Sequence, residues 1–283
     1  MTGMPQVLAL GEAMIEFNQS TKGAPNYLQG FGGDVSNFLI AASRQGASSG
    51  FVSAVGNDHF GQLLLDLWRA ENVDTSTVRV DANAPTGVYF VSHGESGHRF
   101  DYLRAGSAAS RYAVSDLPLD AIAAIDHAKR HGVKVSFDTN LRLKLWPLAR
   151  IASSITARAR ATDICLPSWD DVTELTGLAD KDAIVDFLLA LGPKVVALKL
   201  GKEGAYVATP AERRVVAGRV VKAVDATGAG DCFGGAFIAR IVAGDDPFAA
   251  ARYANVAAAL STQGFGAVAP IPDRATVEKA LAE

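Results

Sequence analysis

Short runs of β-branched and other apolar residues alternate with amphipathic helical stretches, and this alternation restricts the possible folds more than any other feature of the chain. It is typical of a layered α/β protein with a mostly parallel sheet. We expect strands at residues 7–10, 51–55, 133–137, 163–166, 195–200 and 214–220. We expect helices at residues 34–46, 62–71, 120–131, 181–191, 229–243, 247–263 and 273–282.

No repeat or linker divides the chain, so residues 1–283 are predicted to form a single domain. An apolar fraction of 49% excludes a disordered chain. No stretch reaches the roughly 18 apolar residues of a membrane span, and the N-terminus lacks a secretory signal, so we expect a cytoplasmic protein. A net charge of −3 gives no general attraction to nucleic acid or membranes, which leaves small molecules and other protein chains as partners.

A β-hairpin is predicted at residues 88–103, where two strand-like runs flank the turn sequence Gly-Glu-Ser-Gly. Pairing His93 with His98 places Tyr89 opposite Tyr102, and Arg104 follows on the same face. Two phenols and a guanidinium on one side of a sheet suit a small hydroxylated anion. An ordinary sheet face with exposed aromatic residues explains the same spacing equally well.

The segment 225–231 reads Asp-Ala-Thr-Gly-Ala-Gly-Asp and precedes an expected helix. Small residues there leave backbone N–H groups exposed at a helix N-terminus, where unpaired donors and the helix dipole favour an anion. Asp231 falls in the first turn, and the same field is expected to keep it ionised. Asp231 therefore either takes part in chemistry beside a bound phosphate or simply caps the helix.

Two common nucleotide-binding motifs do not match. A dinucleotide motif Gly-x-Gly-x-x-Gly would require glycine at Val35 or at Phe233. A Walker loop would require Ser or Thr after Gly201 and Lys202, where the chain has Glu203. These mismatches disfavour a P-loop enzyme and an NAD-dependent Rossmann enzyme.

Two glycine-containing blocks each open a predicted helix: Gly-Gly-Asp-Val-Ser-Asn at residues 32–37 and the segment 225–231. Together they resemble the two signatures of the PfkB/ribokinase family of sugar kinases. Four further blocks, at residues 11–17, 86–90, 102–108 and 137–142, are most similar to the 2-keto-3-deoxygluconate kinases of this family. The resemblance therefore extends along the whole chain.

The resemblance implies a ribokinase-like three-layer αβα sandwich with a small β-sheet lid, which residues of about 12–31 and 86–104 would form. Lids of this kind commonly pair between subunits, so a homo-oligomer is expected. The family also implies ATP and Mg²⁺ as cofactors and transfer of the γ-phosphoryl group of ATP to a sugar hydroxymethyl group.

By the same resemblance, Asp231 is the base that takes the hydroxyl proton. The N–H groups of Gly228, Ala229 and Gly230 would form an anion hole. The substrate side would consist of Gly33, Asn37, Tyr89, Tyr102, Arg104 and Arg142. The nucleotide side would consist of Ser168, Lys199, Gly201, Gly228, Gly230 and Asn255. Phosphoryl transfer depends on positioning and charge stabilisation more than on a strong base, so an ionised Asp231 suffices.

Arg104 bears on the class of sugar. A guanidinium offers the carboxylate of 2-keto-3-deoxygluconate a planar pair of donors that ribose or fructose does not need, so we expect a sugar acid, phosphorylated to its 6-phosphate. Arg104 could instead pair with Asp101 or Glu95, and Arg142 could belong to a solvated basic face. A ribokinase- or fructokinase-like kinase of a neutral sugar and a non-catalytic sugar-binding regulator are therefore the alternatives.

The chain departs from the family pattern at the metal positions. The family's Asn-x-x-Glu motif is replaced by Ser-Trp-Asp-Asp at residues 168–171, so Asp171 would reach Mg²⁺ through water. Asp225 and Thr227 still resemble the family's loop for a monovalent cation such as K⁺.

A larger departure lies between the hairpin and the strand expected at residues 133–137. Only one helix, at residues 120–131, can be identified there, whereas relatives carry a further strand and helix. Loss of a sheet strand would expose the apolar side chains packed against it, and the free energy lost would exceed the net stability of a domain. We therefore expect residues to be missing from the chain between Arg111 and Asp120.

Overall fold

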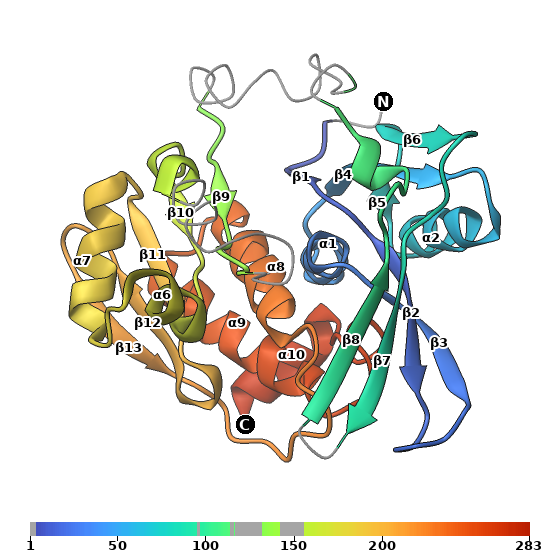
Figure 1. Cartoon of the computed structure of the whole chain (residues 1–283). Coiled ribbons are helices and arrows are strands. Elements are labelled where there is room, and N and C mark those ends of the chain that lie inside the picture. The colour runs from blue at the N-terminus through green and yellow to red at the C-terminus, as the bar shows by residue number, and fades with distance from the viewer. Residues whose placement is uncertain (1–3, 95–96, 114–115, 117–131, 142–155) are drawn as a thin grey trace.

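The computed structural model describes residues 4–94, 97–113, 116, 132–141 and 156–283. Within these residues, the chain forms three β-sheets, with helices packed between and beside them (Figure 1). The α/β architecture predicted from the alternating pattern is confirmed.

The first sheet is built around β4 (Ser49–Gly56). β4 pairs in parallel with β1 (Val7–Leu10), β5 (Val73–Asp74) and β6 (Val78–Asp81). Helix α1 (Asp34–Arg44) precedes β4 and α2 (His59–Ala70) follows it. Trp68 of α2 is fully buried and packs edge-on against Phe51 of β4, which fixes α2 on the sheet.

The second sheet has the strand order β13-β12-β11-β10-β9, with β9 to β11 parallel and β12 and β13 antiparallel. Its strands are β9 (Ser136–Phe137), β10 (Ile164–Cys165), β11 (Val195–Lys199), β12 (Gly204–Ala208) and β13 (Arg213–Ala217). Helices α6 (Trp169–Thr176) and α7 (Lys181–Leu191) bury an apolar cluster against it. Short 3₁₀ helices span Gly201–Glu203 and, in the first half of the chain, Ala109–Arg111.

The third sheet stands where the lid was expected and forms an elongated layer beside α1 (Figure 1). Its order is β3-β2-β7-β8, with β2 (Met14–Gln19), β3 (Tyr27–Gly32), β7 (Val88–Gly94) and β8 (Gly97–Leu103). Tyr89 pairs with Tyr102, as the hairpin register predicts. The turn residues 95 and 96 lie outside the described part of the chain.

Helix α8 (Ala229–Val242) lies near the middle of the molecule, between α1 and α9 (Pro247–Ser261), and α10 (Arg274–Ala282) packs on α9 (Figure 1). Gly235 permits the close approach of α1 and α8. A Cβ at this position would lie 2.7 Å from the Cβ of Ala41 and would clash with the Phe38 carbonyl oxygen. The contact brings the first turns of α1 and α8 next to each other.

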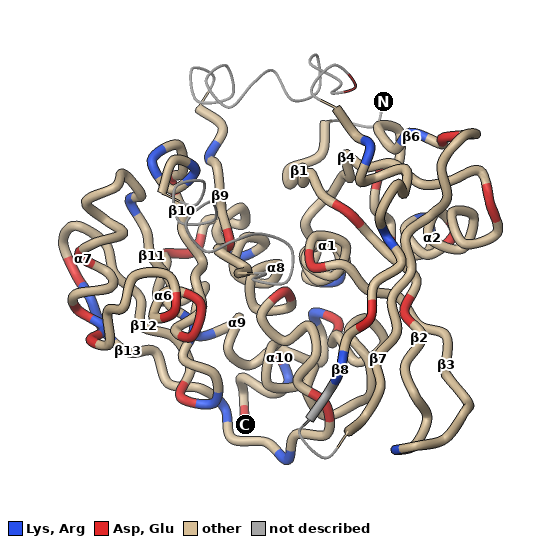
Figure 2. Tube along the Cα trace, viewed as in Figure 1, with Lys and Arg blue, Asp and Glu red and all other residues tan. Residues whose placement is uncertain are grey.

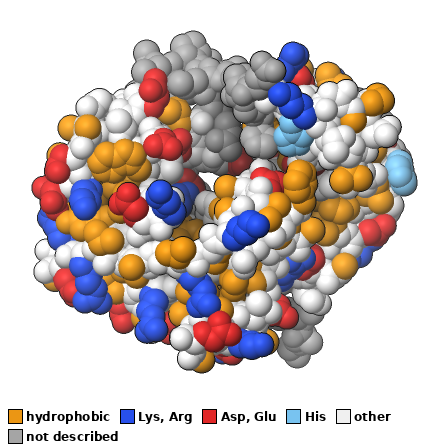
Figure 3. Space-filling view, turned by 90° about the horizontal axis from the view of Figure 1, so that it is seen from below, with side chains coloured by type: hydrophobic (Ala, Val, Ile, Leu, Met, Phe, Trp, Pro, Cys, Tyr) orange, Lys and Arg blue, Asp and Glu red, His pale blue; other side chains and the backbone are white. Residues whose placement is uncertain are grey.

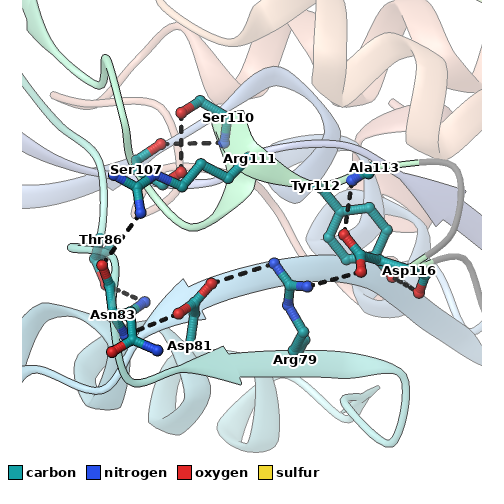
Figure 4. A network of polar contacts seen from close by, with 11 residues as sticks. Arg79, Asp81, Asn83, Thr86, Ser107, Ser110, Arg111, Tyr112, Ala113 and Asp116 are labelled. Carbon is teal, nitrogen blue, oxygen red and sulfur yellow. Dashed lines mark hydrogen bonds and ion pairs between the residues drawn. The ribbon is translucent and has the colours of Figure 1, made fainter.

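A polar network fastens the segment after the lid hairpin to the first sheet (Figure 4). Arg79 of β6 pairs with Asp81 at 3.3 Å and with Asp116 at 3.0 Å. The Ser110 amide donates to the Ser107 hydroxyl at 3.2 Å. The ion pair with Asp116 ties this segment to β6, and the hydrogen bond to Ser107 orders the turn within it.

Several elements differ from the sequence-based expectations. Helix α6 and strand β12 were not predicted, because eight helical residues give little periodicity and Gly-Ala-Tyr-Val-Ala is a weak strand former. The strand expected at residues 133–137 is shortened to β9, and Val133 is exposed. The strand expected at residues 214–220 ends at Ala217, and Val220 is exposed.

The helix expected at residues 120–131 lies outside the described residues, as does most of the segment between Arg111 and Asp120. The expected loss of residues there, and the single domain over residues 1–283, therefore stay predictions. Among the described strands, β1 pairs only with β4, and β9 pairs only with β10. The first and second sheets are thus not hydrogen-bonded to each other within this part of the chain.

The face seen in Figure 3 mixes positive and negative side chains, with apolar groups between them and neither sign gathered into one large area. Among the described helices, none is both long enough and apolar enough to cross a membrane.

We predict that Gly235→Ala lowers the free energy of unfolding by about 2–3 kcal/mol, because the added methyl group overpacks the α1–α8 contact. Gly234→Ala is the matched control in the same helix. There the new Cβ would lie 3.2 Å from the Phe38 ring, which can shift, and the gain in helix propensity offsets the strain, so a change below about 1 kcal/mol is expected. Urea denaturation measures both, and equal stabilities of the two variants would contradict the prediction.

Candidate active site

A cavity of about 640 Å³ opens in front of the N-terminus of α8. Gly228 precedes the helix with φ of 75°, a left-handed conformation that favours glycine, and no side chain among the described residues caps this end. The amides of Gly230 and Asp231 lie in the first turn and have no helical acceptor, so they can bind an anion. The Ala229 amide donates to the Ala226 carbonyl at 3.2 Å, which makes it a weaker member of the expected anion hole.

Asp231 lines the cavity, partly accessible, and links α8 to α1. The Asn37 Nδ2 atom donates to its Oδ2 atom at 2.9 Å. Burial and the carboxylates of Asp34 and Asp138 raise the pKa of Asp231 well above the usual value, while Asn37 and Lys199 lower it. The expectation that the helix N-terminus alone keeps Asp231 ionised therefore needs correction, because it ignored neighbouring negative charge.

Asn37 also carries an unused acceptor. Its side chain is buried, and its Oδ1 atom has no hydrogen-bond donor among the described residues. A buried amide oxygen without a donor costs free energy, and Asn37 itself does not line the cavity.

The lid places two aromatic rings near the start of α1. Gly32 lies against Tyr89, since a Cβ on Gly32 would come within 2.8 Å of its ring, and Gly33 takes a φ of 112° at the helix start. The Tyr89 hydroxyl donates to the Glu16 carboxylate, and the Tyr89 and Tyr102 rings stack with centroids 5.8 Å apart. Burial raises the pKa of both Glu16 and Tyr89.

Arg104 pairs with a residue that the sequence did not indicate. Its Nη2 atom forms an ion pair with the Glu12 carboxylate, and the Ser107 hydroxyl donates to Glu12 Oε1 at 3.2 Å. Asp101, one of the partners considered from the sequence, pairs instead with Arg99 at 2.9 Å. Glu95, the other, lies outside the described residues.

Most of the expected nucleotide-side residues line the same cavity, namely Ser168, Lys199, Gly201, Gly228 and Gly230. Lys199 lies over the helix start, because its Nζ atom is 3.4 Å from the place a Gly230 Cβ would occupy. Its ammonium group pairs with Asp138. Burial raises the pKa of Asp138, and Lys199 acts against this shift.

Several expected site residues that the structure describes do not line this cavity: Gly33, Asn37, Tyr89, Tyr102, Arg104, Ala229 and Asn255. The Asn255 side chain is buried in α9 and donates to the carbonyl oxygens of Val216 at 2.9 Å and Ala217 at 3.1 Å. Asn255 therefore holds β13 in place, and its expected contact with the nucleotide stays a prediction. Arg142 lies outside the described residues.

The cavity is strongly acidic, which suits a divalent cation bound with a nucleotide. Red segments lie beside α1, α6 and α8 in Figure 2, and the cavity is lined by Asp34, Asp138, Asp170, Asp171, Glu203 and Asp231. Asp171 Oδ2 accepts hydrogen bonds from the Thr139 hydroxyl at 3.2 Å and the Leu141 amide at 3.0 Å. Its other oxygen has no donor among the described residues and fits a water ligand of Mg²⁺.

The segment expected to hold a monovalent cation is closed by its own hydrogen bonds. Asp225 Oδ1 accepts from the Thr227 amide at 2.9 Å and from its hydroxyl at 2.7 Å. Asp225 Oδ2 accepts from the Gly266 amide at 3.0 Å. Asp225 thus orders the approach to α8 whether or not an ion binds.

Sequence reasoning missed the acids that surround the expected residues: Glu12, Glu16, Asp34 and Asp138. Each lies inside a sequence block that carries the family resemblance, so the sequence already pointed to these positions. A carboxylate inside a glycine-rich or strand-adjacent block, at a position predicted to be buried, would have identified them as site candidates.

We predict that Asp34→Asn moves the acid limb of the kcat/KM profile to lower pH. A base is active only above its pKa, and removing the neighbouring charge lowers the raised pKa of Asp231. Asp170→Asn is the control, because Asp170 lines the cavity without being among the groups that shift Asp231. Turnover measured from pH 4.5 to pH 8 tests this, and unshifted limbs in both variants would refute it.

Comparison with known proteins identifies the family of this chain. The sequence model of the pfkB family carbohydrate kinases matches residues 4–113 and 100–274. A 2-dehydro-3-deoxygluconokinase of Thermoproteus tenax is 32% identical over 305 residues, covering 96% of this chain and 93% of the relative. A probable fructokinase-5 of Arabidopsis thaliana is 31% identical, covering 99% of this chain and 98% of the relative.

The alignment of 305 residues is longer than this chain of 283, so the relative carries residues without a counterpart here. The two matched stretches meet at residues 100–113, next to the place where the chain is expected to be short.

Among solved structures, a putative ribokinase II from E. coli, in complex with ATP and Mg²⁺, has a TM-score of 0.90 at 26% identity and covers 98% of both chains. A fructokinase from Vibrio cholerae, bound to fructose, ADP and calcium, has a TM-score of 0.87 at 28% identity and also covers 98% of both chains. The ribokinase-like fold expected from the resemblance is confirmed. The chain belongs to the pfkB family and is a carbohydrate kinase.

Proposed function

We propose that this kinase transfers the γ-phosphoryl group of ATP to the terminal hydroxymethyl group of a sugar acid, 2-keto-3-deoxygluconate. The observation that carries the proposal is the position of Asp231, whose carboxylate lines the cavity beside the open amides of α8 and is held by Asn37. The similarity to a 2-dehydro-3-deoxygluconokinase supports the choice of substrate.

In this proposal, the acceptor hydroxyl lies between Asp231 and the γ-phosphorus of ATP. The hydroxyl oxygen forms the new bond to phosphorus, the bond to the bridging β–γ oxygen breaks, and ADP leaves. Asp231 takes the hydroxyl proton, and its raised pKa makes it a better acceptor at neutral pH than an ordinary carboxylate. The amides of Gly230 and Asp231, with the Lys199 ammonium above them, stabilise charge on the transferred group.

Mg²⁺ would neutralise charge on the phosphate groups of ATP, and Asp171 would hold it through water at the acidic wall of the cavity. The site for K⁺ near Asp225 and Thr227 stays a prediction, which the potassium dependence of the rate would test. ATP as the donor favours the expected cytoplasmic location.

Arg104 supports a sugar acid, because its Nε and Nη1 groups have no acceptor among the described residues and suit a carboxylate. The Glu12–Arg104 ion pair favours a second candidate, a neutral ketohexose such as fructose, since Glu12 already balances the positive charge. Similarity to fructokinases supports the same alternative.

We also propose that two copies of the chain pair through their lids. Leu28 of β3 and Leu103 of β8 are 59% and 67% exposed, and a partner lid would cover such edge-strand leucines. Light scattering at micromolar concentration should give twice the mass of the chain, and a monomer would contradict this pairing.

A coupled assay of ADP formation across sugars and sugar acids tests the proposed function. We expect a higher kcat/KM for 2-keto-3-deoxygluconate than for fructose or ribose. Better turnover of a neutral sugar would reject the sugar acid in favour of the second candidate, and no turnover of any sugar would reject both.

We predict that Asp231→Asn lowers kcat by about 10²-fold or more while the Kd for ATP stays within a few-fold, because the amide keeps the shape but cannot take the proton. Stopped-flow turnover and calorimetric titration with an ATP analogue measure the two quantities. Near-normal turnover would remove Asp231 from its role as the base.

A further inference from the structure

The Glu12–Arg104 pair lies where lid and helix α1 meet, outside the lining of the cavity and among the residues expected to hold the sugar. Glu12 is 13% exposed and Arg104 29% exposed, so solvent screens their interaction only in part. The Glu12 carbonyl oxygen lies against Gly33 at the start of α1, and a Cβ on Gly87 of the neighbouring lid segment would come 3.1 Å from Glu12 Oε1. The Glu12 backbone therefore lies against the start of α1, and its carboxylate lies beside the lid.

Glu12 engages only one end of the guanidinium. The ion pair uses Nη2 of Arg104, and Nε and Nη1 have no acceptor within the described part of the chain. A ligand carboxylate could therefore still bind Arg104 through the free edge of its guanidinium. It would then approach a pair whose net charge is zero, with the negative Glu12 on the far side.

The surroundings add further negative charge. Asp34 interacts electrostatically with Glu12, Tyr89 and Asp231, and Glu16 lies beside Tyr89. Burial raises the pKa of Glu12 although Arg104 and Ser107 lower it, so the ionised form of Glu12 is less favourable here than in water. A neutral sugar is indifferent to these charges, whereas an acidic sugar is repelled unless Arg104 outweighs them.

We propose that Glu12 is a specificity-determining residue, which sets the preference of the site between sugar acids and neutral sugars by balancing the charge of Arg104. The inference rests on the proposed function, because it concerns the acceptor of the same phosphoryl transfer. Glu12 acts through Arg104 and does not itself touch the reacting atoms.

The test is Glu12→Gln, which keeps an oxygen acceptor for Arg104 and Ser107 and removes only the charge. We expect the ratio of kcat/KM for 2-keto-3-deoxygluconate to kcat/KM for fructose to rise about tenfold, through a lower KM for the acid. The KM and kcat for fructose should stay within about twofold, which separates a charge effect from general damage to the site.

Two further variants make the test specific. In the Arg104→Gln background, Glu12→Gln should leave the ratio unchanged, because the charge it balances is gone. Asp101→Asn is the matched control, since it removes one negative charge from the same lid at the Arg99 pair and should also leave the ratio unchanged. Thermal melting of each variant shows whether it is folded. If Glu12→Gln unfolds, Glu12→Asp replaces it. The shorter side chain should loosen the ion pair with Arg104 and give a smaller rise in the ratio of kcat/KM values.

A ratio that stays within twofold or falls in Glu12→Gln would overturn the inference while leaving the proposed function intact. A rise of equal size without Arg104, or in Asp101→Asn, would overturn it as well. Failure of the unsubstituted enzyme to use either substrate would overturn the proposed function, and the inference with it.

Discussion

The site depends on the close contact between helices α1 and α8. Gly235 lets the two backbones approach, and the approach places Asn37 of α1 within hydrogen-bond distance of Asp231 of α8. Helix α1 supplies the asparagine, and helix α8 supplies the carboxylate and the open amides. In the proposed role of Asp231 as the base, a carboxylate held 2.9 Å from its donor needs little reorganisation when the substrate arrives, and such positioning is the main contribution that a protein makes to phosphoryl transfer.

The charges around this contact oppose one another. Four carboxylates, from Glu12, Glu16, Asp34 and Asp231, come from the lid and from the first turns of α1 and α8, and burial raises the pKa of three of them, Glu12, Glu16 and Asp231. On the other side, Lys199 is paired with Asp138. Buried carboxylates cost free energy unless cations or hydrogen-bond donors compensate them, so the same acids would favour the cationic and hydroxylated ligands of the proposed reaction.

Much of the fold could be predicted from local patterns, because helix periodicity, capping residues and hairpin turns act over a few residues. The pairing of Tyr89 with Tyr102 followed from the turn alone, and helix α7 begins and ends at the expected residues. The pairing of Arg104 with Glu12 could not be predicted in this way, because the two residues meet only when the lid folds against α1. The raised pKa of Asp231 has the same origin, since Asp34 and Asp138 approach it from other elements. Asn255 matched a family position by sequence, yet its amide is committed to β13 by tertiary packing.

The two halves of the site come from separate stretches of the chain. Glu12, Asn37, Tyr89 and Arg104 all precede residue 105, whereas Asp138, Lys199 and Asp231 all follow residue 137. Among the described strands, no hydrogen-bonded ladder joins the sheets that carry these stretches, and the helices α1 and α8 connect them. Under the proposed roles, substitutions in the first stretch would alter the choice of sugar and leave the phosphate-binding residues of the second stretch as they are. The acceptor specificity could then be redesigned separately from the donor half of the protein.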